Sequence, residues 1–256
     1  DMLVGGAGAD TLDGGTGTDI VNYVFSSSGV NVNLATNVST GGDAAGDILR
    51  NIEIINGSFY NDTFTGDDTA NIINSDAGHD NLNGGGGDDI LKGGYDSDII
   101  DGGSGNDTVS YSESSTGAVT VNLATNVNFG GDAGGDMLYN IENILGGDFN
   151  DNLTGNAGNN IINGGVGNDM LVGGAGADTL DGGAGTDTVN YVFSSSGVNV
   201  NLATNVNTGG DAQGDVLSNI ENITGSAFAD TLTGDTIANI INGGAGNDIL
   251  IGGAGA

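Results

Sequence analysis

Aspartate side chains recur at a nine-residue spacing in residues 164–190, and they are the groups in this sequence best suited to chemistry. The stretch reads GGVGNDMLV, GGAGADTLD and GGAGTDTVN, so glycine holds the first, second and fourth positions, aspartate the sixth and an aliphatic residue the eighth. Carboxylates and backbone carbonyls are hard oxygen ligands, which suit Ca²⁺ and no soft metal. Residues 164–190 are therefore interpreted as a repeated calcium-binding turn.

Each nonapeptide divides into a turn of six residues and a strand of three. Glycine serves where a tight turn needs a positive φ, which strains a residue that carries a Cβ. Alternate carbonyls of an extended run point to the same side, so the carbonyls of positions two and four are predicted to converge with the carboxylate of position six. The eighth residue points inward and forms a narrow aliphatic core. One turn supplies about half of the roughly 6–8 oxygens that Ca²⁺ takes, so turn n should share its ion with turn n+2.

The same frame fits strictly at eight places along the chain. A flexible glycine-rich linker would not keep aspartate and an aliphatic residue in a fixed phase, so we set that interpretation aside. Gly93 opens a ninth turn, in which Asp96 replaces the fourth glycine. The strict turns begin at Gly5, Gly14, Gly84, Gly102, Gly164, Gly173, Gly182 and Gly243.

This frame resembles the repeats-in-toxin (RTX), or haemolysin-type, calcium-binding nonapeptide repeat. The resemblance implies an all-β fold: a parallel β-roll (β-solenoid) of stacked calcium-binding nonapeptide turns, here interrupted by irregular β segments. It also implies a tandem-array segment of a large secreted bacterial protein, exported by type I secretion and folded outside the cell, at the cell surface.

The expected metal ligands are the sixth-position carboxylates and the carbonyls of the second and fourth glycines. The carboxylates belong to Asp10, Asp19, Asp62, Asp80, Asp89, Asp98, Asp107, Asp151, Asp169, Asp178, Asp187, Asp230 and Asp248. The glycines are Gly6, Gly8, Gly15, Gly17, Gly85, Gly87, Gly94, Gly103, Gly105, Gly165, Gly167, Gly174, Gly176, Gly183, Gly185, Gly244 and Gly246. Asparagine replaces the sixth-position aspartate, as a weaker candidate ligand, at Asn71, Asn160 and Asn239.

Pairing each turn with the second turn after it predicts where the ions lie. The pairs are Asp62–Asp80, Asn71–Asp89, Asp80–Asp98, Asp89–Asp107, Asp151–Asp169, Asn160–Asp178, Asp169–Asp187 and Asp230–Asp248. We therefore expect about eight or more Ca²⁺ ions. Asp10 and Asp19 find no such partner in the frame, and their partners are expected outside this chain. Without calcium the stacked carboxylates repel, so the chain is expected to be largely unfolded.

A second, longer period organises the whole chain, because residues 1–37 repeat residues 169–205 with differences only at positions 16 and 20. Nonapeptide runs are predicted at 1–22 (partial), 57–110, 146–190 and 225–256 (truncated). Irregular β segments are predicted between them, at 23–56, 111–145 and 191–224. The chain therefore looks like a slice of a longer tandem array.

The first turn of three runs departs from the frame, because an aromatic residue replaces the fourth glycine. These residues are Tyr60, Phe149 and Phe228. Weaker or missing calcium is expected in these turns, and the aromatic side chains are expected to plug the end of the core.

Each irregular segment contains a polar loop with two aspartates four residues apart. The loop offers either further calcium ligands or a plain Asx-turn, and the sequence leaves both interpretations open. The paired residues are Asp43 and Asp47, Asp132 and Asp136, and Asp211 and Asp215.

The composition excludes several classes of protein. The chain has 256 residues, of which 52 are glycine and none is cysteine, and 34 acidic side chains stand against 2 basic ones, giving a net charge of −32. Without cysteine there is no disulfide framework, so metal takes the stapling role. No apolar run is long enough to span a bilayer. The acidic surface repels nucleic acid and anionic headgroups, so neither nucleic-acid binding nor membrane insertion is expected.

No residue pattern typical of a catalytic site is present, and the chain is not expected to be an enzyme. The single histidine, His79, fills the variable fifth position of a nonapeptide and is interpreted as a surface residue. The sequence lacks a nucleophile elbow and a phosphate-binding loop.

Three functions fit this sequence. The first is a calcium-rigidified structural region of a surface protein, such as an adhesin stalk, an S-layer or a sheath or filament subunit. Its candidate partners besides calcium are other copies of itself or cell-surface polysaccharide. The second is an accessory module of a secreted enzyme, similar to the R-modules of alginate epimerases or the tails of RTX proteases and lipases. The third, ice binding, needs a regular Thr and Asn ladder at the third and fifth positions, which these turns lack. Near-identical long repeats favour the structural function.

Overall fold

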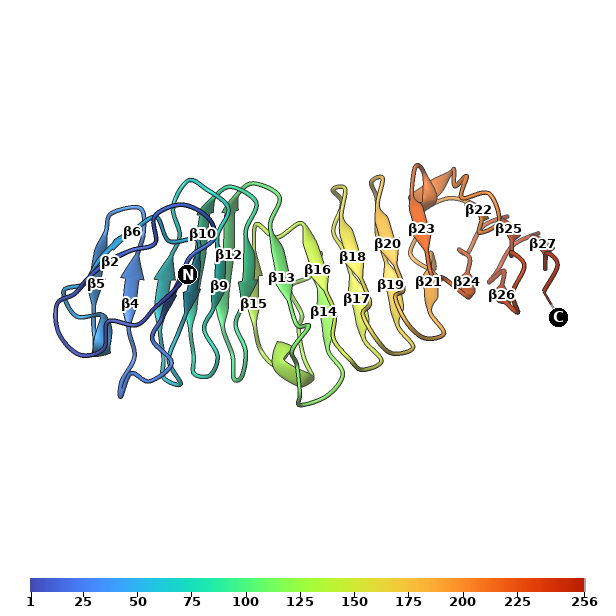
Figure 1. Cartoon of the computed structure of the whole chain (residues 1–256). Coiled ribbons are helices and arrows are strands. Elements are labelled where there is room, and N and C mark those ends of the chain that lie inside the picture. Colours follow the sequence, from blue (N-terminus) through green and yellow to red (C-terminus); the bar gives the residue numbers. More distant parts are fainter. Residues whose placement is uncertain (256) are drawn as a thin grey trace. The chain divides into compact units, whose positions relative to one another are not determined.

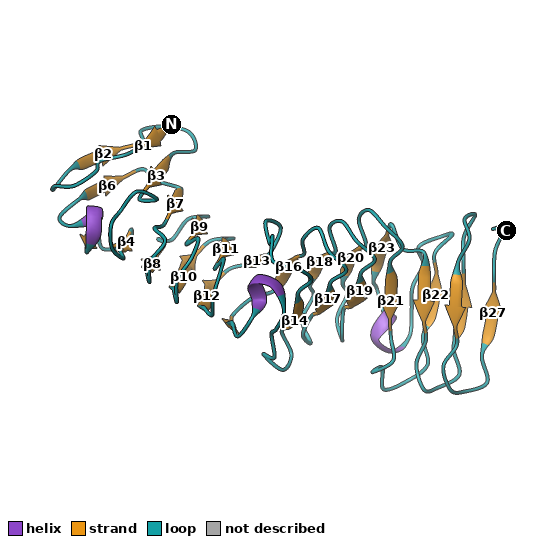
Figure 2. Ribbon diagram, turned by 90° about the horizontal axis from the view of Figure 1, so that it is seen from below, coloured by secondary structure: helices purple, strands orange, loops and turns teal. Residues whose placement is uncertain are grey.

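The computed structural model describes residues 1–255 and consists of short strands, most of them three residues long, joined by tight turns (Figure 1). The described residues contain no α-helix, and none of their helical segments could cross a bilayer. Three short 3₁₀ turns occur, and Figure 2 shows them in purple. They are η1 (Gly42–Ala44), η2 (Gly131–Ala133) and η3 (Gly210–Ala212).

The chain divides into two compact units. Unit 1 contains Asp1–Tyr111 and Val127–Ile141, and unit 2 contains Ser112–Asn126 and the chain from Glu142 onward.

In unit 1 the strands form two long parallel ladders and one short one. The first ladder is β1 (Met2–Leu3), β3 (Ile20–Asn22), β7 (Ile54–Asn56), β9 (Ile72–Asn74), β11 (Ile90–Lys92) and β13 (Thr108–Ser110). The second is β4 (Asn31–Asn33), β8 (Thr63–Thr65), β10 (Asn81–Gly86), β12 (Ile99–Ser104) and β15 (Met137–Tyr139), with β5 (Val38–Thr40) antiparallel to β4 at its edge. The short one pairs β2 (Thr11–Asp13) with β6 (Ile48–Arg50).

Unit 2 has three parallel ladders of the same kind. The first is β16 (Asn143–Leu145), β18 (Ile161–Asn163), β20 (Thr179–Asp181) and β23 (Val216–Ser218). The second is β14 (Thr120–Asn122), β17 (Asn152–Thr154), β19 (Met170–Val172), β21 (Thr188–Asn190), β24 (Asn222–Thr224) and β26 (Ile240–Asn242). The third is β22 (Asn199–Asn201), β25 (Thr231–Thr233) and β27 (Ile249–Ile251). In Figure 1, strands β16, β18 and β20 follow one another in one ladder, and β17, β19 and β21 in another.

The register of these ladders confirms the predicted parallel β-roll. Leu82 of β10 pairs with Ile100 of β12, and Leu171 of β19 pairs with Val189 of β21, so neighbouring strands are two nonapeptides apart. Two nonapeptides therefore make one coil, and each coil contributes one strand to each of two ladders.

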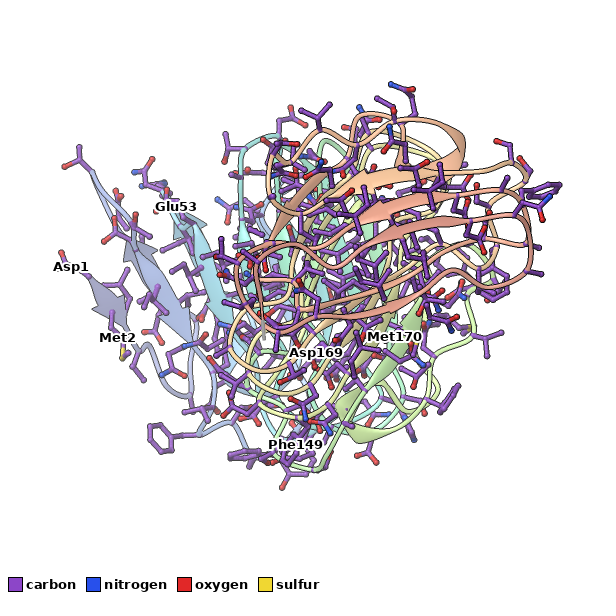
Figure 3. The ribbon with its side chains drawn as sticks, turned by 90° about the vertical axis from the view of Figure 1, so that its right-hand side faces the viewer. Asp1, Met2, Glu53, Phe149, Asp169 and Met170 are labelled. Atoms are coloured by element: carbon purple, nitrogen blue, oxygen red, sulfur yellow. The ribbon has the colours of Figure 1, made fainter. Side chains whose placement is uncertain are left out.

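The eighth-position residues form the core, as their alternation in the sequence predicts. Leu91, Ile100, Leu171 and Leu180 are completely buried. Outward side chains alternate with them. Figure 3 labels Asp169, which is buried, and the next residue, Met170, which is exposed.

The irregular segments continue the ladders. In unit 1, β6 pairs with β2 and places Leu49 beside Leu12, while β7 pairs with both β3 and β9. In unit 2, β23 pairs with β20 and places Leu217 beside Leu180. The reason is local, because residues 47–50 (DILR) and 215–218 (DVLS) have the acidic residue and the inward aliphatic residue of an ordinary nonapeptide strand.

The aromatic residues that replace the fourth glycine do not plug the core, so that prediction is wrong. Tyr60, Phe149 and Phe228 are 48%, 39% and 47% exposed, and Phe149 lies at the periphery in Figure 3. The fourth position lies on the outside of the turn, where a side chain faces solvent.

Candidate metal centre

The glycines of each turn bring the backbone against the sixth-position carboxylate. Gly165 and Gly167 have φ values of 95° and 143°, in the region that favours glycine. Gly164 is required by space instead, because a Cβ there would collide with the Oδ2 atom of Asp169 and the carbonyl oxygen of Gly182. The turn that opens at Gly164 is therefore closed around the Asp169 carboxylate.

One oxygen of most sixth-position carboxylates accepts a backbone N–H of the preceding coil. The N–H of Asp151 donates to Oδ1 of Asp169 at 2.8 Å, and the N–H of Asp169 donates to Oδ1 of Asp187 at 2.7 Å, each across 18 residues. The same bond joins the two members of every predicted pair. The other six are Asp62–Asp80, Asn71–Asp89, Asp80–Asp98, Asp89–Asp107, Asn160–Asp178 and Asp230–Asp248.

The second carboxylate oxygen of many sixth-position aspartates lacks a donor from the protein. Among the described residues this holds for the buried Oδ2 atoms of Asp10, Asp19, Asp80, Asp89, Asp98, Asp169, Asp178 and Asp187. A buried anionic oxygen without a hydrogen-bond donor is costly in free energy. A hard cation beside each oxygen would remove that cost, so the residues present fit Ca²⁺.

Burial raises the pKa of the carboxyl groups of Asp98, Asp169 and Asp178 above the ordinary value of 3.8. The pKa of Asp169 rises to about 6, that of Asp178 to about 7 and that of Asp98 to about 8. Burial is the largest cause in each case, because it disfavours the charged form. Hydrogen bonds from the preceding coil oppose it, whereas repulsion from a nearby carboxylate adds to it, from Asp136 at Asp98 and from Asp215 at Asp178.

The predicted carbonyl ligands lie in the same turns. The second-position carbonyl of Gly165 accepts the N–H of Ala184 at 2.8 Å, which leaves that oxygen one further lone pair. The fourth-position carbonyl oxygen of Gly167 lies so close to Gly185 of the following coil that a Cβ there would collide with it. We retain the second- and fourth-position carbonyls as proposed ligands.

The described residues contain no group of three or more His, Cys, Asp or Glu side chains that converges on one point. An ion held here must therefore combine carboxylates from neighbouring coils with backbone carbonyls. This oxygen-only ligand set suits Ca²⁺ and not Zn²⁺, which prefers nitrogen and sulfur ligands in a closed tetrahedron.

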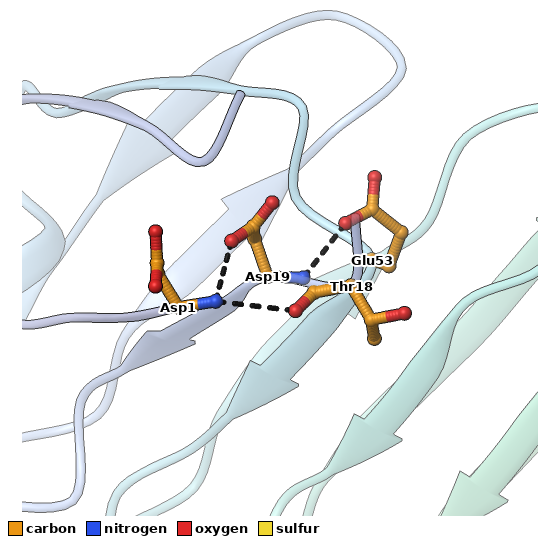
Figure 4. A network of polar contacts seen from close by, with 4 residues as sticks. All are labelled: Asp1, Thr18, Asp19 and Glu53. Carbon is orange, nitrogen blue, oxygen red and sulfur yellow. Dashed lines mark hydrogen bonds and ion pairs between the residues drawn. The ribbon is translucent and has the colours of Figure 1, made fainter. Parts of the chain in front are cut away.

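Asp10 and Asp19 have partners inside the chain, so the prediction that their partners lie outside it is wrong. The amino group of Asp1 donates to Oδ1 of Asp19 at 2.6 Å, at the usual 18-residue spacing, as Figure 4 shows. The N–H of Asp10 donates to Oδ1 of Asp47 at 2.8 Å. The nonapeptide frame missed Asp47 because Asp43 and Ala45 stand where the frame needs its second and fourth glycines.

In the first turn of each later run, protein donors satisfy both carboxylate oxygens. Asp230 accepts the N–H of Val198 at 2.8 Å and the hydroxyl of Ser226 at 2.8 Å on Oδ1, and the N–H of Ser226 at 2.7 Å on Oδ2. Asp62 makes the equivalent three bonds, and Asp151 accepts two backbone N–H groups. This satisfaction supports weaker calcium binding in these turns, which stays a prediction.

The sixth-position asparagines also find partners within their own turn. The amide oxygens of Asn71, Asn160 and Asn239 accept the second-position N–H at 2.8–2.9 Å. The fifth position forms a further ladder that the sequence analysis missed: Asn150 Oδ1 accepts the N–H of Asn168 at 2.8 Å. His79 lies on the surface at this position, as expected, with its ring Nδ1 3.1 Å from the carbonyl oxygen of Ser97.

The polar loops of the irregular segments contain a second kind of aspartate whose two carboxylate oxygens both accept hydrogen bonds from the protein. Oδ1 of Asp215 accepts the N–H of Asp178 at 3.0 Å, and its Oδ2 accepts the hydroxyl of Tyr191 at 2.8 Å. Asp47 and Asp136 are bonded in the same way, with tyrosine hydroxyls at 3.0 Å and 2.9 Å. The earlier aspartate of each loop lies in a 3₁₀ turn and stays a candidate ligand; these are Asp43, Asp132 and Asp211.

The family model for the RTX calcium-binding nonapeptide repeat, in four copies, matches residues 1–23, 51–82, 75–109, 140–171, 164–191 and 221–256. No curated protein matches the chain at a significant level. The matched residues make up more than half of the chain and contain the carboxylate ladder. The chain belongs to the family of RTX calcium-binding nonapeptide-repeat proteins.

Proposed function

We propose that this chain is a calcium-binding structural repeat region of a secreted bacterial surface protein, which folds and becomes rigid when it binds Ca²⁺ outside the cell. The observation that supports this most is the row of buried Oδ2 atoms without protein donors, repeated from coil to coil. Protein interiors rarely tolerate such atoms, so the row calls for a cation at each step.

Calcium would serve as a cross-link between coils. The carboxylates of Asp169 and Asp187, with the carbonyls of turns such as 164–167, would hold an ion between successive turns. The ion supplies positive charge to a chain whose net charge is −32, and it removes the repulsion between stacked carboxylates. Binding free energy then contributes directly to folding free energy.

The place of folding follows from calcium affinity. Extracellular calcium modules typically bind with dissociation constants of about 10⁻⁴ to 10⁻³ M, well above the free calcium of a cytoplasm. Sites of this strength would stay empty during type I secretion and fill outside the cell. An unfolded chain before export and a rigid one after it is the behaviour that this proposal requires.

A structural role at the surface, as in an adhesin stalk, an S-layer or a sheath, is supported by the near-identity of residues 1–37 and 169–205. Tandem copies that continue the same parallel ladders extend a scaffold without adding a catalytic group. Other copies of the chain or cell-surface polysaccharide are the proposed partners, and we propose no enzymatic activity for this region.

A calcium titration followed by far-UV circular dichroism tests this proposal, with Mg²⁺ as the control cation. We expect the β signal to rise with Ca²⁺ and to change little with Mg²⁺, which demands a smaller octahedral shell and releases water reluctantly. A β signal that is already complete in calcium-free buffer at neutral pH would overturn the proposal.

A further inference from the structure

We infer that Glu53 and Glu221 complete two additional calcium sites, in which a glutamate of the irregular segment takes the place of the sixth-position aspartate of the next coil. The pairs are Asp19 with Glu53 in unit 1 and Asp187 with Glu221 in unit 2. The inference rests on the proposed calcium binding, and it extends the carboxylate ladder beyond the nonapeptide runs.

Glu221 makes the same bond as an aspartate of the regular ladder. Its Oε2 accepts the N–H of Asp187 at 2.7 Å, just as Oδ1 of Asp187 accepts the N–H of Asp169 at 2.7 Å. The backbone follows the same path, because the N–H groups of Glu221 and Asn222 both donate to the carbonyl oxygen of Asp187, at 3.1 Å and 2.8 Å. Glu221 therefore stands in the ladder where the next aspartate would be.

The Asp187 carboxylate gives a second observation that points to a bound cation. Asp187 is 0% exposed, and its Oδ2 is buried without a hydrogen-bond donor. Its environment is as closed as that of Asp169 in the coil before it, which also has a donorless Oδ2. A site with this unsatisfied oxygen and a second carboxylate on the next coil has the charge and the hard ligands that a divalent cation needs.

A backbone carbonyl oxygen also lies beside Asp187 in the position that it has in the regular ladder. In the regular ladder the carbonyl oxygen of Gly182 packs against Gly164 so closely that no Cβ would fit, and Asp169 Oδ2 lies beside it. At the next step the carbonyl oxygen of Asn219 packs in the same way against Gly182, beside Asp187. Asn219 adopts a φ of 51°, the left-handed conformation that aims its carbonyl there.

The choice of glutamate follows from the length of the turn. A regular turn places five residues before its aspartate, whereas only Asn219 and Ile220 separate the end of β23 from Glu221. From this shorter turn, the additional methylene of glutamate lets its carboxylate reach the N–H of Asp187 at 2.7 Å.

Unit 1 repeats the arrangement with separate residues. Oε2 of Glu53 accepts the N–H of Asp19 at 2.9 Å, a bond that Figure 4 shows, and Asp19 is 2% exposed with a donorless Oδ2. The carbonyl oxygen of Asn51, at a φ of 52°, packs against Gly14 beside Asp19. Because the same geometry occurs in both units, it is not a chance feature of one loop.

Counting bound ions in the variants Glu53→Gln, Glu221→Gln and the double variant by native mass spectrometry in calcium tests the inference. A glutamine side-chain oxygen still accepts the N–H of Asp19 or Asp187, so a purely structural glutamate predicts an unchanged count. The matched control is Glu113→Gln, which removes the same charge from an exposed position of another irregular segment.

We expect one ion fewer than wild type in each single variant, two fewer in the double variant and no loss in the control. Far-UV circular dichroism on the same samples reports the fold, and a rise in the calcium midpoint of Glu221→Gln but not of Glu113→Gln also supports the site. Wild-type counts and midpoints in both glutamine variants would overturn the inference. A wild-type chain that binds no calcium would instead overturn the proposed function itself.

Discussion

The nonapeptide coils and the tyrosine-containing coils each have an aspartate at the same place in the ladder, but its second carboxylate oxygen has different surroundings in the two. In both, Oδ1 accepts the N–H of the preceding coil, as at Asp187 and Asp215. Oδ2 of Asp187 is buried without a donor, whereas Oδ2 of Asp215 accepts the hydroxyl of Tyr191, a side chain that is itself buried.

This difference favours the interpretation that a buried hydroxyl takes the place of the metal ion that we propose for the nonapeptide coils. A tyrosine proton satisfies one carboxylate oxygen inside a single chain, and it needs no ligand from the environment. The coils with Tyr23, Tyr111 and Tyr191 are therefore expected to hold together at lower calcium than the nonapeptide coils. In this interpretation, each Tyr–Asp hydrogen bond of an irregular segment is a calcium-independent staple within a calcium-dependent roll.

Calcium removal should break the comparison most completely. In chelator at neutral pH we expect the amides of β19, β20 and β21 to lose protection from hydrogen exchange first, because we propose that cations hold their coils together. Protection around Tyr191 and Asp215 should be lost at lower calcium than that of the nonapeptide strands. Mass spectrometry of exchanged peptides measures this order, and simultaneous loss everywhere would contradict the distinction between the two kinds of coil.

Acid should partly replace calcium in the nonapeptide coils. In the folded state the pKa values of Asp169, Asp178 and Asp98 are about 6, 7 and 8, above the ordinary 3.8, so the fold binds more protons than the unfolded chain between about pH 4 and 8. Their stabilising contribution is complete below about pH 4 and is lost as the pH rises through these values.

We therefore expect more β signal at pH 5 than at pH 8 in calcium-free buffer, and a higher calcium midpoint at the lower pH because protons compete with the ion. Circular dichroism at a series of pH values measures both effects. A calcium-free β signal that rises with pH would show that the carboxylates are not the titrating groups.

The substitution Asp169→Ala should weaken one step of the ladder. It removes one carboxylate oxygen without a donor and the acceptor of the Asp151 N–H, which leaves that buried N–H unsatisfied at a cost of about 1–3 kcal/mol. We expect the calcium midpoint for folding to rise about tenfold, which corresponds to about 1.4 kcal/mol. Asp148→Ala, at an exposed position of the same run, is the control and should leave the midpoint unchanged.

The substitution Tyr191→Phe should convert a staple into a calcium-dependent coil. It removes only the hydroxyl and leaves Oδ2 of Asp215 buried without a donor, at a cost of about 1–3 kcal/mol. The denaturant midpoint should fall, and most of the loss should be recovered at high calcium but not at high magnesium. Tyr60→Phe removes a hydroxyl from an exposed side chain and serves as the control. Equal effects of the two substitutions would rule out the staple.

Much of this architecture could be read from the sequence because the nonapeptide is a local code. The inward Leu171 and Leu180, the ladder bond from Asp151 to Asp169 and the all-oxygen ligand set all follow from phase within nine residues. Because the pattern recurs in many turns, each inference can be checked against the neighbouring turns.

The sequence failed where the chain leaves the nine-residue phase. The partner of Asp10 is Asp47, 37 residues away, and the partner of Asp187 is Glu221, 34 residues away. The hydroxyl that satisfies Asp215 comes from Tyr191, 24 residues away. These separations depend on how a non-repeating loop returns to the roll, and no periodic pattern fixes that path.

The sequence by itself therefore determined the β-roll, its core and the chemistry of its ladder, because an 18-residue coil repeats the same short-range geometry. Only the tertiary structure decided which carboxylate oxygens are left without a donor. That outcome depends on whether a tyrosine hydroxyl, a serine or nothing from the protein reaches the second oxygen, and contacts between distant segments set it.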